Sequence, residues 1–305
     1  MSHRKGSIVT TRQQQETLDY FRAHAEDWRS KAEGSGPPEV NIIEQRNSFV
    51  LRVAGARPAT RAFLDVGCGT GELVCQVARR GIASFGVDYA PEMISLATQK
   101  ARTDGVEGAE FTCCSIFDFH MASGAYDLIS ANGFIEYVSL PQMLALFDRV
   151  AEALAPGGSF VVGSRNRLFN LVSMNQFTVQ ELESGGMELL MNEAVKWSEA
   201  KSPAVVVGTP CAPLQADQTE HARTGIDVAT RFQYTPLQLI GVLHERGLHP
   251  VEVYPVHIHG VTPTFKAAHP EVHNSIANLL QAFAGPTTEL LSHASTFMLH
   301  VQRSS

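Results

Sequence analysis

Hydrophobic positions follow two alternating periods between about residues 60 and 165. Short apolar runs such as "AFLDV" and "SFGVD" predict buried strands, and the stretches between them carry apolar residues every three or four positions, as amphipathic helices do. Strands that alternate with helices predict a doubly wound, mostly parallel α/β sheet covered on both faces. The expected strands are 62–67, 84–88, 109–115, 126–133 and 159–164, and the expected helices are 71–80, 91–102 and 140–154.

The alternation stops after Ser164 and resumes near residue 231. Residues 168–230 mix short helical patterns with a loop-like, Pro-containing stretch, and we expect them to form an inserted substrate lid. A helix entered through Thr235 as N-cap and closed by Gly247 follows. A strand over 250–260, a helical insertion over 269–285 and a last strand over 295–303 complete a seven-stranded sheet.

The first 60 residues predict a helical segment laid on this domain. Apolar residues at spacings of three and four, including Phe21 and Trp28, predict one helix over 16–33, and a second is expected over 40–53. Tyr20 and Trp28 either pack against the domain or close over its ligand. The chain therefore divides into residues 1–60, a domain formed by 61–167 and 231–305, and the insertion 168–230.

Charge and composition exclude several classes of protein. The net charge of −7 and the pI of 5.9 argue against a protein that neutralises nucleic-acid phosphates. No stretch reaches the roughly 20 apolar residues that cross a bilayer, and the first residues lack the apolar core of a secretory signal. We therefore expect a cytoplasmic protein with neither nucleic-acid nor membrane partners. Five cysteines without a C-x-x-C pair predict neither a disulfide framework nor a structural zinc site.

A glycine-rich loop in "AFLDVGCGTGE" follows the first expected strand directly. Gly67, Gly69 and Gly71 permit a tight turn and a close approach of backbone to ligand at the start of a helix. Glu72 occupies the position where a Walker loop has lysine, and where the dinucleotide pattern has its third glycine. The spacing is instead G-x-G-x-G.

"LDVGCGTGE" resembles the first motif of the class I S-adenosylmethionine-dependent methyltransferases. The resemblance implies a Rossmann-like fold and S-adenosylmethionine as cofactor, held by residues of this loop: Asp65, Gly67, Cys68, Gly69 and Gly71. Asp88 ends the second strand, where a carboxylate can accept hydrogen bonds from ribose hydroxyls. "DYAPEMISLA" resembles the family's next motif, which implies that Tyr89 and Met93 pack on adenine.

Two further segments extend the resemblance, which covers about residues 60–165 strongly and 232–302 at the level of pattern. In "CSIFDF", Ser115 replaces an Asp that the family often places near the adenine amino group, and Ile116 follows beside the ring. "YDLISANGFIEYV" resembles the segment beneath the methionyl part and implies that Asn132 lies near the cofactor. Enzymes of the ubiquinone-biosynthesis type often have a Glu-His pair where this chain has Glu136 and Tyr137.

The carboxyl ends of the later strands are expected to hold the acceptor, because ligands of open α/β sheets lie there. His257 and His259 share one strand face and, with Glu136, are the candidate bases, unless the histidines only face solvent. We expect no metal site. Arg165, Arg167 and Tyr137 are candidate acceptor contacts; the two arginines pair with an acceptor carboxylate or phosphate, or form salt bridges to the lid.

These observations predict methyl transfer to an oxygen or nitrogen of a small-molecule acceptor. A non-catalytic ligand-sensing domain with the same fold is the principal alternative. A nicotinamide-dependent oxidoreductase shares the sheet but conflicts with Glu72. The identity of the acceptor and the oligomeric state stay open.

Overall fold

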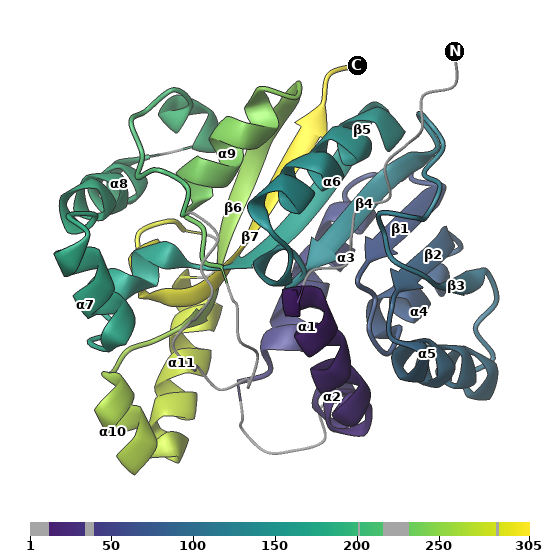
Figure 1. The fold of residues 1–305 in the computed structure, drawn as a ribbon, viewed down its shortest axis with the longest axis horizontal. Coiled ribbons are helices and arrows are strands. Elements are labelled where there is room, and N and C mark those ends of the chain that lie inside the picture. The colour runs from purple at the N-terminus through teal and green to yellow at the C-terminus, as the bar shows by residue number, and fades with distance from the viewer. Residues whose placement is uncertain (1–11, 34–39, 201, 216–231, 285–286) are drawn as a thin grey trace.

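The chain folds around one seven-stranded sheet in the order β3-β2-β1-β4-β5-β7-β6 (Figure 1). The computed structural model describes residues 12–33, 40–200, 202–215, 232–284 and 287–305. β1 to β5 are parallel, whereas β7 is antiparallel to both of its neighbours. The strands are β1 (Ala62–Val66), β2 (Ala83–Asp88), β3 (Ala109–Cys113), β4 (Tyr126–Asn132), β5 (Leu154–Arg165), β6 (Leu248–Ile258) and β7 (Ala294–Arg303). The predicted sheet is confirmed, with a topological switch point between β1 and β4.

Both faces of the central strands are buried, which explains why β1 and β4 are mostly apolar. Phe63 and Leu64 are neighbours on β1 but pack into separate hydrophobic clusters, as do Leu128 and Ile129 on β4. α3 (Ile42–Gly55), α4 (Glu72–Ala78) and α5 (Pro91–Thr103) cover one face. α6 (Leu140–Ala153) and α9 (Pro236–His244) cover the other (Figure 1).

The N-terminal segment differs in one respect from the expectation. The helix expected over 16–33 is two helices, α1 (Arg12–Ala23) and α2 (Ala25–Glu33), which meet at His24. Phe21 and Trp28 pack with Ala25 against Met93 of α5. These helices therefore lie at the carboxyl edge of the sheet, beside the glycine loop.

The described part of the insertion is built into the main core. It comprises η2 (Arg167–Leu171), α7 (Gln176–Glu183), α8 (Met187–Glu199) and η3 (Pro203–Val206). Leu190 and Trp197 of α8 belong to the cluster that packs beneath α6 and α9. The buried Glu193 carboxylate accepts hydrogen bonds from Trp197 Nε1 (3.1 Å) and Leu237 N (3.0 Å). Residues 216–231 of the predicted lid lie outside the described residues.

Two helices separate β6 from β7, where the sequence predicted one. α11 (Pro270–Ala284) is the expected helix, and α10 (Pro263–Ala268) precedes it; η4 (Leu291–His293) leads into β7. The predicted N-cap of α9 is confirmed, because Thr235 and Gln238 form a capping box.

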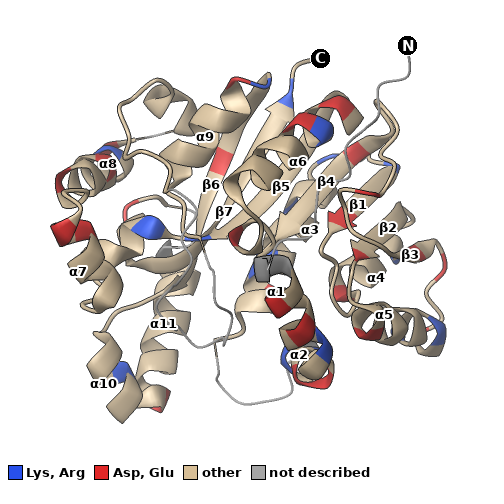
Figure 2. Ribbon diagram, in the orientation of Figure 1, with Lys and Arg blue, Asp and Glu red and all other residues tan. Residues whose placement is uncertain are grey.

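Charged residues lie mainly on the outer helices and loops, and most of the strand residues are uncharged (Figure 2). Asp65 and Asp88 are exceptions, since both stand near the carboxyl ends of interior strands. Among the helices that the structure describes, none is long and apolar enough to cross a membrane.

Candidate functional site

A cavity of about 960 Å³ lies at the carboxyl ends of the strands. Its volume is at the upper end of the range of small-molecule pockets. α1, α2 and α3 supply one wall, and the rim from β1 to β7 supplies the rest. The predicted site residues that line it are Asp65, Gly67, Cys68, Gly69, Asp88, Tyr89, Met93, Ser115, Ile116, Asn132, Glu136, Tyr137, Arg165, His257 and His259.

The three glycines of the loop have different surroundings. Gly67 N donates to Val87 O (2.8 Å), which ties the loop to β2. A Cβ on Gly71 would lie 2.7 Å from Ala97 Cβ, whereas a Cβ on Gly69 would meet no atom within 4 Å. Gly69 therefore presents bare backbone to the cavity. Gly71, expected in the cofactor site, does not line the cavity, and its missing side chain serves the packing of α4 on α5.

Two carboxylates flank the glycine loop, and Asp88 holds it by a hydrogen bond. Asp88 accepts hydrogen bonds from Gly69 N (3.1 Å) and Ala90 N (2.9 Å), and burial raises its pKa. Asp65 accepts a hydrogen bond from Ser130 Oγ (2.5 Å), and burial raises its pKa to about 7. Each carboxylate thus combines a structural hydrogen bond with a position on the cavity wall.

The side-chain amide of Asn132, on the cavity wall beside the glycine loop, has no hydrogen-bond partner. Both its Oδ1 and its Nδ2 are buried and make no hydrogen bond. Buried amides in proteins normally have partners, so an orphan amide on a cavity wall fits a ligand that both donates and accepts. Gly69 and Asn132 line the same cavity, so the residues present fit a polar cofactor.

The far end of the cavity is lined by Glu136, Tyr137 and Arg165. Glu136 belongs to η1 (Ile135–Tyr137), is buried, and accepts a hydrogen bond from Arg165 N (3.0 Å). Tyr137 packs edge-to-face on Phe21, with ring centroids 5.4 Å apart. The carboxylate thereby joins the end of β4 to the end of β5.

Two roles were expected for Arg167, an acceptor contact or a salt bridge to the lid, and the structure shows the salt bridge. Its guanidinium is buried and forms a bidentate ion pair with Glu181 of α7 (2.7 and 2.8 Å). A third hydrogen bond reaches Pro213 O. Arg167 does not line the cavity. The residue holds the insertion to the sheet because it lies beyond the end of β5, at the start of η2, where its side chain pairs with α7.

His257 and His259 are brought together but do not face solvent. Their side chains are buried, and their ring centroids lie 4.1 Å apart. Burial lowers the pKa of His257 to about 2 and that of His259 to about 3. Both imidazoles are therefore neutral, but they are far weaker bases than a histidine with a pKa near 6.5.

His257 also has an unusual backbone. Its φ of +56° is in the left-handed region, and its N–H donates to Gln45 Oε1 of α3 (2.9 Å) instead of to β7. Such strain in a residue that is not glycine costs of order 1–3 kcal/mol and concentrates at functional sites.

Several cavity residues escaped prediction because they come from distant parts of the chain. Thr17 reaches the cavity from α1, Arg46 from α3 and Lys266 from α10, whereas Trp28, expected either to pack on the domain or to close over its ligand, also lines the cavity. His273 of α11 lies behind the wall and contacts His257. The amphipathic pattern of residues 16–33 was the available signal for Trp28; nothing local marks Lys266 or His273.

The sequence of this chain is similar to those of known proteins. Residues 63–158 match a family described as a methyltransferase domain. A ubiquinone biosynthesis O-methyltransferase from Xanthomonas euvesicatoria pv. vesicatoria (strain 85-10) is 32% identical over 157 residues. The alignment covers 50% of this chain and 62% of that relative's length.

Two solved structures share the fold. Magnesium protoporphyrin IX methyltransferase from Synechocystis PCC 6803 with bound SAH has a TM-score of 0.53 at 16% identity, covering 95% of this chain and 99% of its own. The [4+2]-cyclase SpnF has a TM-score of 0.55 at 16% identity, covering 97% of each chain. The family match over residues 63–158, the strand order and the glycine loop agree that this chain has the fold of the class I methyltransferases.

Proposed function

We propose that this chain is an S-adenosylmethionine-dependent methyltransferase that moves a methyl group to an oxygen or nitrogen of a small-molecule acceptor. The observation that carries the proposal is the pairing of bare backbone at Gly69 with the orphan amide of Asn132 on one cavity wall. When bound, S-adenosylmethionine supplies an electrophilic methyl group on a sulfonium centre.

The cofactor would occupy the end of the cavity beside β1, β2 and β4. Asp88 has carboxylate lone pairs left for ribose hydroxyls besides its two backbone hydrogen bonds. Tyr89, Met93, Ser115 and Ile116 line the part of the wall where the adenine is expected. Ser115 Oγ accepts a hydrogen bond from Phe117 N (3.3 Å), so its role in the loop is at least partly structural.

The acceptor would lie toward β5, β6 and β7. Arg165, Lys266 and Arg46 bring positive charge to this end, against the acidic residues Glu136 and Glu44, which line the cavity from η1 and α3. This balance supports an acceptor with a carboxylate, phosphate or other anionic oxygen. The 960 Å³ cavity under the N-terminal helices supports a small molecule over a polymer.

Positioning accounts for most of the expected rate acceleration. Holding the reacting atoms in line and excluding water can contribute about 7–11 kcal/mol. The low pKa values of His257 and His259 suit hydrogen bonding to the acceptor better than removal of its proton. The name of the Xanthomonas relative supports an oxygen acceptor.

The fold by itself does not decide the reaction, because SpnF has the same fold and is a cyclase. Calorimetry of the full chain with S-adenosylmethionine and with NAD is the first test. Binding of the sulfonium compound alone is expected, and binding of NAD alone would contradict the proposal. Transfer of radiolabelled methyl to a panel of phenols, carboxylated phenols and amines then separates an enzyme from a ligand sensor.

Asp88→Ala should weaken S-adenosylmethionine binding by about 2–3 kcal/mol, because it removes charge-assisted hydrogen bonds. Asp104→Asn is a suitable control, because Asp104 is paired with Arg79 and Lys100 outside the cavity. Equal affinity of the two variants would contradict the assigned ribose contact.

A further inference from the structure

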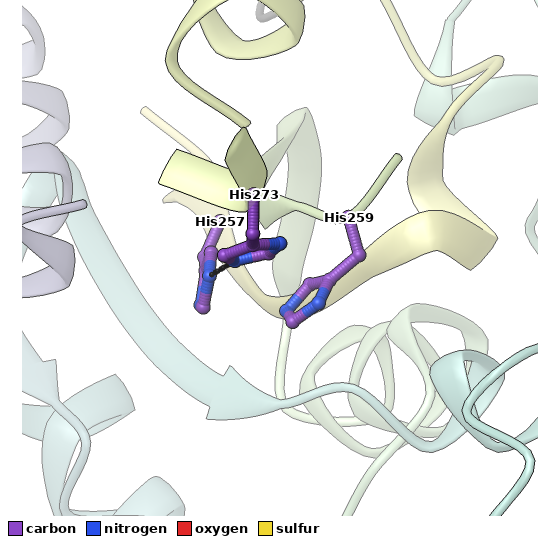
Figure 3. Close-up of side chains that lie close together, drawn as sticks. All are labelled: His257, His259 and His273. Carbon is purple, nitrogen blue, oxygen red and sulfur yellow. Dashed lines mark hydrogen bonds between the residues drawn. The ribbon is translucent and has the colours of Figure 1, made fainter. Parts of the chain in front are cut away.

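Three histidines from two segments meet at the acceptor end of the cavity (Figure 3). His257 and His259 come from the end of β6, and His273 comes from α11. One ring nitrogen of each lies within 4.8 Å of the others, and all three side chains are buried. His257 Nε2 and His273 Nε2 are 3.1 Å apart.

The hydrogen bonds of the cluster leave ring nitrogens unsatisfied. Both nitrogens of His259 and Nδ1 of His273 are buried and make no hydrogen bond. Three imidazoles that converge without enough partners have the donor set of a transition-metal site.

We propose that His257, His259 and His273 bind a divalent transition-metal ion such as Zn²⁺. Four ligands placed tetrahedrally at 2.0–2.1 Å from zinc are about 3.3 Å from one another. The His257–His273 pair already has this separation. His259 would have to approach by roughly 1.5 Å from a separation of up to 4.8 Å. It follows the last residue of β6 and directly precedes the bend at Gly260; its ring packs on Phe169, with centroids 4.6 Å apart, so Phe169 would have to shift with it.

The surroundings supply further features of a metal site. Ligating histidines usually form a second hydrogen bond that fixes their orientation. His257 Nδ1 lies 3.1 Å from Ser295 Oγ, which leaves Nε2 for the ion. The left-handed backbone of His257, held by Gln45, fixes where its side chain leaves the strand.

A three-histidine site has an open coordination position. His257 and His259 line the cavity, whereas His273 lies behind them, so this position faces the cavity. An anionic or hydroxyl oxygen of the acceptor could complete the coordination, and the ion would then lower the pKa of that hydroxyl. This role of the metal rests on the proposed function, but metal binding does not.

Positive charge near the three histidines opposes the binding of a cation. Lys266 lies close enough to lower the pKa of all three histidines, and Arg46 and His293 act on parts of the cluster. Burial lowers the pKa of Lys266 itself. If Lys266 instead makes this region an anion site, phosphate should bind there and zinc should not.

Metal binding can be measured on the full chain without cofactor or acceptor. Competition of the metal-free protein with a chromophoric chelator should give one Zn²⁺ per chain. His259→Gln and His273→Ala should each weaken binding about 100-fold or more, and Ser295→Ala roughly tenfold. His300→Gln should leave affinity unchanged, because His300 is also buried but hydrogen-bonds Ser159 (2.8 Å) outside the cluster.

A spectroscopic measurement covers the case in which His273→Ala does not fold. Co²⁺ added to the wild-type protein should give the strong visible bands of a four- or five-coordinate ion, and His259→Gln should lose them. Lys266→Met should bind zinc at least as tightly as wild type.

Weak zinc binding that is equal in wild type and His259→Gln would overturn the proposal. So would phosphate binding that Lys266→Met abolishes while zinc fails to bind. S-adenosylmethionine binding, measured separately, shows whether the proposed function fails independently.

Discussion

The two ends of the cavity are constructed in different ways. At the cofactor end, the backbone of Gly67 and Gly69 and two carboxylates come from one segment, residues 65–88, in which hydrogen bonds tie the glycine loop to Val87 and Asp88 of β2. At the acceptor end, side chains come from α3, η1, β5, β6 and α10, which are up to about 200 residues apart in sequence. The first end is a local motif, whereas the second exists only in the folded chain.

The largest expected effect tests whether Arg167 is a structural residue outside the cavity. Arg167→Met should destabilise the protein by about 3–5 kcal/mol, because it leaves the buried Glu181 carboxylate without its partner. Arg22→Met, in an ion pair with Glu92 that is largely exposed, should cost less than about 1 kcal/mol. Urea unfolding measures both. If Arg167→Met is stable but its turnover is impaired, Arg167 contacts the acceptor after all.

A methyl group on the glycine loop tests the cofactor end. Gly69→Ala should weaken S-adenosylmethionine binding by roughly 10- to 100-fold, because the residue has a φ of +51° and its Cβ would enter the cavity. Gly81→Ala is the matched control: Gly81 has a φ of +78° and open space, but lies outside the cavity. Calorimetry should show normal affinity for Gly81→Ala. Equal losses would mean that backbone strain alone is responsible.

The pH dependence of the affinity for S-adenosylmethionine tests the role of Asp65. Its free pKa is about 7, raised by burial and by Asp88 and opposed by the Ser130 hydrogen bond. A cationic cofactor would favour the ionised form and lower that pKa. Affinity should therefore be highest above pH 7 and fall by up to about fivefold from pH 7 to pH 6 as Asp65 takes up a proton. Asp65→Asn should remove this dependence; an unchanged pH profile in that variant would show that Asp65 does not sense the cofactor charge.

The smallest expected effect concerns Ser115, which stands where the resembled family often has Asp. Ser115→Asp should strengthen cofactor binding about three- to fivefold, by a contact worth about 1 kcal/mol with the adenine amino group. The new carboxylate can still accept the hydrogen bond from Phe117 N, so the loop should keep its shape. Ser115→Asn serves as the uncharged control. Weaker binding in Ser115→Asp would place the adenine elsewhere.

The sequence predicted the sheet and the glycine loop around the proposed cofactor end because periodicity and glycine spacing are local signals. The strands, the glycine loop and the N-cap at Thr235 follow from neighbouring residues. Gly71 shows the limit: its spacing matches the motif, yet its empty side is filled by Ala97 and Phe111 from other elements.

The acceptor end was predicted only in part. The carboxyl-end rule selected Arg165 and both strand histidines, but not His273, which α11 delivers from 14 residues beyond His259. Strand periodicity placed the two histidines on one face without showing that helices cover them. Burial, which decides their pKa values, depends on packing that no local pattern records.

The hydrogen bond from His257 to Gln45 makes the acceptor end depend on the start of the chain. Arg52 and Glu252 add a bidentate ion pair between the same helix and strand. The methyltransferase match begins only at residue 63, so it excludes the helix that shapes β6. A chimaera that grafts residues 63–305 onto another enzyme's N-terminal helices would inherit the glycine loop intact but not the backbone of His257. In such hybrids, acceptor selectivity is expected to follow the donor of the N-terminal helix as much as the donor of the sheet.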